Sequence, residues 1–115
     1  MSWYVLVEAN EYHSGDNVWR LVDKVPVDGG REAAIARAEE TSRTWVRGTP
    51  PEGEGRLVFR TSETSWLVER SSYKQYEGTS DPIKQTRHLR VSVAELVMAR
   101  EPARLDPPKK GWLRR

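Results

Sequence analysis

The chain contains the three residue types of a hydrolytic triad within four positions, namely His13, Ser14 and Asp16. A Ser-His-Asp triad requires side chains that converge from separate backbone positions, which neighbouring residues of one loop rarely achieve. Serine, glycine and aspartate are also common turn formers, and Gly15 lies between Ser14 and Asp16. The segment therefore predicts a turn and no catalytic site.

Ligands for a metal ion are scarce in this chain. It has no cysteine, which excludes disulfides, thiolate nucleophiles and cysteine–zinc sites, and His13 and His88 show no ligand spacing. The acidic pairs are Glu39-Glu40, on the polar side of a predicted helix, and Glu52 with Glu54, in a predicted loop. No apolar residues surround either pair to perturb its pKa for acid–base catalysis. We expect no metal, no cofactor and no enzymatic activity.

The positions of apolar residues predict the elements around these candidates. Period-two alternation predicts five strands, at 3–9, 18–25, 56–61, 65–70 and 87–91. Helical spacing predicts one helix from Arg31 to Arg47, with Gly48 as its cap. Ser92 and Glu95 form a capping box that predicts a second helix to Arg100, although the fifth strand could instead continue to Val93. Residues 71–85 are polar and predict a long loop.

These elements predict an α+β fold. We expect a mostly antiparallel sheet of about five strands, in the element order β-β-α-β-β-β-α, packed on one long helix. Residues 1–101 are assigned to a single domain, a size that can bury its own core. Residues 102–115, with three prolines, are assigned to an extended or disordered basic C-terminal tail.

The charge of the chain is concentrated in that tail. The net charge is +2, and residues 101–115 hold five cations and two carboxylates, or +3, which leaves −1 for the rest. The body is thus not a basic surface of the kind that binds nucleic acid. The apolar N-terminal run is too short for a signal peptide or a membrane span, so we expect a cytoplasmic protein without membrane contact. The excess of arginine over lysine favours a bacterial origin with a GC-rich genome.

Tryptophan is unusually frequent, with five residues beside a single phenylalanine. Trp3, Trp19, Trp45 and Trp66 are candidates for the core, with at least one left for a binding surface, and Trp112 lies in the tail. The leading hypothesis is a small non-enzymatic interaction, adaptor or regulatory module that binds a protein partner or itself. Nine residues are partner-binding candidates: Tyr73, Tyr76, Arg87, Arg90, Lys109, Lys110, Trp112, Arg114 and Arg115.

Two other classes of function stay open. The alternative is a nucleic-acid-binding protein that uses the basic tail together with the region from Tyr73 to Arg90, where cations and aromatics alternate. The third class is a small-ligand carrier or enzyme with a pocket between sheet and helix. A continuous surface of tyrosines, arginines and tail would favour nucleic acid, and a bare apolar patch would favour a protein partner.

Overall fold

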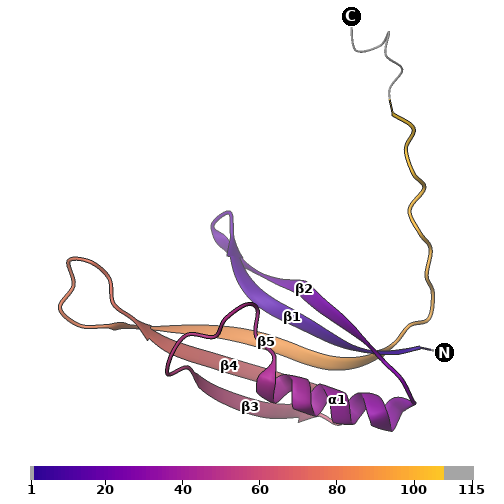
Figure 1. The fold of residues 1–115 in the computed structure, drawn as a ribbon, viewed down its shortest axis with the longest axis horizontal. Coiled ribbons are helices and arrows are strands. Elements are labelled where there is room, and N and C mark those ends of the chain that lie inside the picture. Colours follow the sequence, from indigo (N-terminus) through magenta and orange to yellow (C-terminus); the bar gives the residue numbers. More distant parts are fainter. Residues whose placement is uncertain (1, 108–115) are drawn as a thin grey trace, which may run out of the picture.

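The structure is a computed structural model that describes residues 2–107. Its elements are β1 (Trp3–His13), β2 (Asp16–Val27), α1 (Arg31–Thr44), β3 (Gly55–Ser62), β4 (Ser65–Lys74) and β5 (Ile83–Glu95). The strands form one antiparallel sheet in the order β2-β1-β5-β4-β3, and α1 packs on one face of it (Figure 1). The predicted five-stranded antiparallel sheet with a helix is confirmed.

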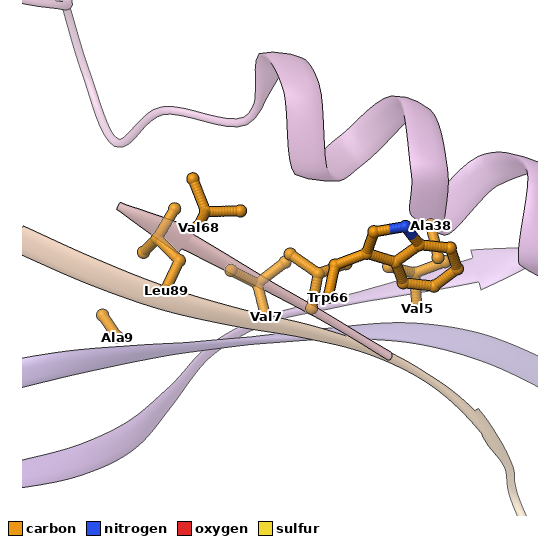
Figure 2. Close-up of a cluster of buried hydrophobic side chains, with 8 residues drawn as sticks. Val5, Val7, Ala9, Ala38, Trp66, Val68 and Leu89 are labelled. Carbon is orange, nitrogen blue, oxygen red and sulfur yellow. The ribbon is translucent and has the colours of Figure 1, made fainter. Parts of the chain in front are cut away.

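The hydrophobic core lies between the sheet and α1. Cross-strand partners share a face, so the register places Val7, Val91 and Trp66 side by side on the face that α1 covers. Trp66 is only 3% exposed, and Figure 2 shows its ring beside Ala38 of the helix. Small helix residues at the contact let α1 approach the strands closely. The core is therefore built on one face of the sheet.

The helix is shorter than the sequence predicted. It begins after Gly30 and ends at Thr44, so the predicted long helix to Arg47 is wrong. Trp45 is extended, and the guanidinium of Arg56 donates to the carbonyls of Ser42 (2.9 Å) and Trp45 (2.6 Å). Those donors satisfy carbonyl groups that a longer helix would have bonded internally. Gly48, predicted as the cap, lies in the following loop with a φ of 72°.

The predicted second helix does not exist, and this part of the prediction is wrong. β5 continues through the capping-box residues to Glu95, and Val93 pairs with Val5 of β1. The alternating Leu89, Val91 and Val93 face the core, so burial against β1 outweighs the local preference of Ser92 for a helix start. Beyond Glu95 the described residues form no helix or strand and lead away from the body (Figure 1).

Almost half of the predicted loop at 71–85 is strand. β4 runs to Lys74 and β5 starts at Ile83, so residues 75–82 alone connect them. Ser71 to Lys74 pair with Ile83 to Thr86 although the segment is polar. The polar composition of this segment predicts a loop. In the fold, an adjacent strand supplies backbone hydrogen-bond partners that stabilise the segment as a strand.

Replacement of the buried tryptophan tests this core. Trp66→Ala is expected to lower the free energy of unfolding by about 3–5 kcal/mol, because it empties a large buried site. Tyr73→Ala, at a side chain 70% exposed on the same strand, is expected to cost under about 0.5 kcal/mol. Urea denaturation of both variants measures the two values, and equal losses would contradict the one-sided core.

Candidate functional site

The face of the sheet opposite α1, here called the open face, carries a row of side chains across all five strands. Cross-strand pairing sets that row from edge to edge as Leu21, Glu8, Arg90, Leu67 and Phe59. The strands alternate so that their core residues point to α1 and these residues point away from it. Within residues 2–107 no helix or strand packs on this face.

Large apolar side chains on the open face are exposed to solvent. Leu21 is 53% exposed, Leu57 is 55% exposed and Phe59 is 50% exposed. Leu6 and Leu67 are half-buried between them. Exposed apolar side chains that cluster on one face of a folded protein often mark an interaction surface, whereas isolated exposed apolar side chains usually do not.

The two charged groups at the centre of the open face, Glu8 and Arg90, are paired with each other. Arg90 donates to Glu8 at 3.3 Å, and its guanidinium lies 3.9 Å from the ring centroid of Trp19, a cation–π geometry. Beside this pair, Nε2 of His88 lies 3.6 Å from a carboxylate oxygen of Glu69. The pair Glu8–Arg90 thus carries no net charge at the centre of the open face.

A second feature, here called the fork, lies where the two outer hairpins separate. β1 pairs with β5 only as far as Ala9 and Leu89. Beyond that point, residues 10–13 pair with β2 alone and residues 83–88 pair with β4 alone. Figure 1 shows the β1–β2 hairpin diverging from the β4–β5 hairpin. Among the described residues, no backbone hydrogen bond joins the two strand edges that face each other across the fork.

The fork opens into a cavity of about 820 Å³. Its walls are the two free strand edges and the loop that follows α1, including Trp45 and Arg47. Four cations line it, namely Arg47, Arg70, Lys74 and Arg87, beside the carboxylates Glu11 and Glu54. Both carboxylates are already in ion pairs, Glu11 with Arg47 at 2.8 Å and Glu54 with Arg70 at 2.7 Å. The surplus charge of the cavity is positive.

Glu54 anchors the wall of this cavity. Its two carboxylate oxygens accept parallel hydrogen bonds from Arg70, both at 2.7 Å, and Arg56 lies 3.7 Å away. The three side chains are between 11% and 15% exposed. Paired guanidinium–carboxylate bonds of this geometry are among the stronger polar contacts. Because Arg56 also holds the end of α1, the network ties helix, loop, β3 and β4 together.

The network perturbs the ionisation of its members. The hydrogen bond from Arg70 holds the pKa of Glu54 below its ordinary value, against the opposing effect of burial, and the charges of Arg70, Arg56 and Arg87 add to the lowering. Burial lowers the pKa of Arg56. Glu54 is thus held as a carboxylate, which suits a structural anchor and not a proton donor.

The structure does not bring the four described partner-binding candidates, Tyr73, Tyr76, Arg87 and Arg90, into one surface. Arg87 points to the α1 side and lines the fork, whereas Arg90 lies on the open face. Tyr73 lies at the far end of β4 and Tyr76 in the loop 75–82, with Nζ of Lys74 5.3 Å from the ring centroid of Tyr76. The remaining five candidates, Lys109, Lys110, Trp112, Arg114 and Arg115, lie outside the described residues.

The sequence-based candidates include Arg90 of the open face and Arg87 of the fork, but other residues of both surfaces were missed. Leu57 and Phe59 alternate along one predicted strand, but the sequence did not identify them as candidates for a binding surface, and both are half exposed. The available signal was that the strand 65–70 has apolar residues on both faces, with Leu67 between Trp66 and Val68. Glu54 was read as a solvated loop carboxylate, and only the fold brings Arg70 to it. No local pattern marked the fork.

Residues 2–107 contain no group of three or more histidine, aspartate or glutamate side chains placed to hold a metal ion. No helix in that part of the chain is both long and apolar enough to cross a bilayer. Comparison with protein-family models, with curated proteins and with solved structures finds no match to the chain.

Removal of the anchoring charge tests the cavity wall. Glu54→Gln is expected to lower the free energy of unfolding by about 3 kcal/mol, because it leaves two largely buried arginines without their carboxylate. The matched control is Glu63→Gln, which breaks an exposed pair with Arg31 and should cost under about 1 kcal/mol. Urea denaturation at pH 7 measures both, and a smaller loss at Glu54 than at Glu63 would remove the anchor role.

The same network predicts a dependence on pH. The pKa of Glu54 is lowered in the folded protein, so its stabilisation is complete above the ordinary value of 4.5 and is lost as the pH falls through the folded value. The difference in unfolding free energy between wild type and Glu54→Gln is therefore expected to be constant above pH 5 and to shrink below about pH 4. Denaturation midpoints at a series of pH values measure it. A difference unchanged at pH 3 contradicts the prediction.

Proposed function

We propose that the protein is a non-enzymatic interaction module whose open face binds the open face of a second copy. The observation that carries the proposal is the uncovered face of the sheet, on which Leu21 of β2 and Leu57 and Phe59 of β3 are each about half exposed. Sheets with apolar residues on both faces require a layer on each side. One helix covers one face, and an identical sheet supplies the layer for the other.

The size of the open face suits a stable pair. Five strands spaced about 4.8 Å apart, over the seven residues of β1 that pair with β5, give a footprint of about 550 Å² per chain. Two such footprints approach the roughly 1,200 Å² at which specific interfaces begin, and rough side-chain surfaces bury more area than a flat projection. Aligned packing of two sheets is a common way to bury such faces.

The charges of the open face also suit a second copy. A surface with one sign of charge repels an identical surface, which costs several kcal/mol. Here Glu8 is paired with Arg90, so this central pair presents no net charge to a second copy, and Glu69 lies beside the imidazole of His88. Trp19, held under Arg90, is a large aromatic anchor of the kind found in interfaces.

The other classes of function receive less support. A nucleic-acid interface was expected to join Tyr73, Tyr76, Arg87 and Arg90 to the tail, but Arg87 and Arg90 lie on opposite faces. The chain also leaves the sheet at the end of β5 away from the loop 75–82 (Figure 1). An enzyme would need a carboxylate free to act on a substrate. Among the described residues, the one carboxyl group with a lowered pKa is Glu54, and it is held in an ion pair with Arg70.

Substitutions on the two faces of β3 test self-association. Sedimentation equilibrium of the wild-type chain is expected to give twice the 13.2 kDa of one chain at concentrations of tens of micromolar. The double variant Leu57→Ser/Phe59→Ser is expected to sediment as a monomer while it keeps the circular dichroism of the folded sheet. It removes two large exposed apolar groups of the open face, and neither is among the buried residues of the core.

Val58→Ser is the matched control for this experiment. Val58 lies between the two positions, points to the α1 side and is 37% exposed, so its replacement should leave the dimer intact. A wild-type chain that is monomeric up to 200 µM, or a dimer that survives loss of both Leu57 and Phe59, would falsify the proposal.

A further inference from the structure

We infer that the fork is a second binding site, separate from the open face, which takes an extended acidic peptide segment as an added strand. The inference rests on three features of one place in the fold: two free strand edges, an adjoining cavity and a positive surplus of charge. It does not depend on self-association.

The free edges supply the main-chain partners. Residues 10–13 of β1 and 83–88 of β5 each pair on one side only, and the backbone groups on their other sides face the fork. In the described chain those groups have no backbone or side-chain hydrogen-bond partner. An extended peptide added to such an edge forms the ladder bonds that the sheet lacks.

The geometry of the fork provides room for one strand. The two edges are paired at Ala9 and Leu89, where neighbouring strands stand about 4.8 Å apart, and they separate from there on. A strand inserted between two edges needs those edges to be about twice that distance apart. Because the two edges diverge, their separation reaches that value at some point along the fork. The cavity of about 820 Å³ at this point confirms open volume lined by both edges, with residues 9–12 on one side and 85–89 on the other.

The side chains around the fork specify the chemistry of the peptide. On the α1 side, Arg87 and Lys74 line the cavity, and neither lies within ion-pair distance of a carboxylate in residues 2–107. On the other side, Tyr12 and Tyr73 are 74% and 70% exposed. A strand presents alternate side chains to opposite faces, so the matching peptide alternates acidic with apolar or aromatic residues.

The chain's own C-terminal segment does not have this chemistry. Residues 101–115 carry five cations against two carboxylates, which is the wrong sign for a site with surplus arginine and lysine. The described residues beyond Glu95 also leave the sheet at the end of β5 opposite the fork (Figure 1). The fitting occupant is therefore an acidic segment of a different protein.

Selection from a library of random twelve-residue peptides displayed on phage tests the inference without a known ligand. The full chain is expected to enrich sequences in which acidic residues alternate with apolar ones. The double variant Lys74→Glu/Arg87→Glu is expected to lose the affinity of those peptides at least tenfold. The control Arg100→Glu/Arg104→Glu makes the same change of net charge, from +2 to −2, in the segment beyond the sheet, and should retain binding.

Hydrogen exchange of the best enriched peptide's complex then locates the contact. Amides among residues 10–13 and 83–88 that face the fork are expected to exchange at least tenfold more slowly with peptide bound. Leu57→Ser/Phe59→Ser should keep peptide binding, so loss of the dimer and loss of the peptide site are separate results. The inference is overturned if no acidic sequence is enriched, if Lys74→Glu/Arg87→Glu binds as well as wild type, or if the edge amides gain no protection.

Discussion

The pairing of β5 with both β1 and β4 is the contact on which the rest of the structure depends. β5 is the last strand in the sequence and the middle strand of the sheet, so it joins a hairpin from the start of the chain to one from its second half. Without it, Val7 and Trp66 would lose Val91, which lies between them in the core. The pair Glu8–Arg90 spans most of the chain, so a large loop-closure entropy opposes this contact until the flanking apolar residues are buried with it.

The fork follows from the same constraint. β5 has thirteen residues, but β1 pairs with only its second half, and the first half belongs to the hairpin with β4. The loop after α1 keeps the resulting space open, because Glu54 holds it to Arg70 on β4. Arg56 adds the end of α1 to the same network. The cavity beside the free strand edges is therefore walled by strands and by a loop that ion pairs hold in place. Walls of this kind favour a binding site, because they keep the cavity from closing.

Sequence patterns predicted the elements whose signals are local and failed where distant partners decide. The sheet and the position of the helix follow from alternation and helical spacing, both properties of short windows. Ser92 met every local requirement of a helix start, yet the pairing of Val93 with Val5 decides its conformation. Residues 71–74 have loop composition and become strand because β5 lies beside them. The open face was not predicted for a related reason: alternation reveals that a strand has two faces, but not how many layers the chain provides to cover them.

Two binding surfaces on one small sheet are compatible because they use different parts of it. The open face is centred on the segment where all five strands run together, and the fork lies beyond the last β1–β5 pair. Among residues 2–107 the core contains nine buried apolar residues, all on the α1 side or in α1 itself, which is a thin core for a chain of this length. A second layer on the open face would add apolar burial that this helix cannot supply. The strand edges of the fork face sideways and not toward that layer, so a dimer would present two such forks and could hold two copies of one partner, with the gain in avidity that linked sites provide.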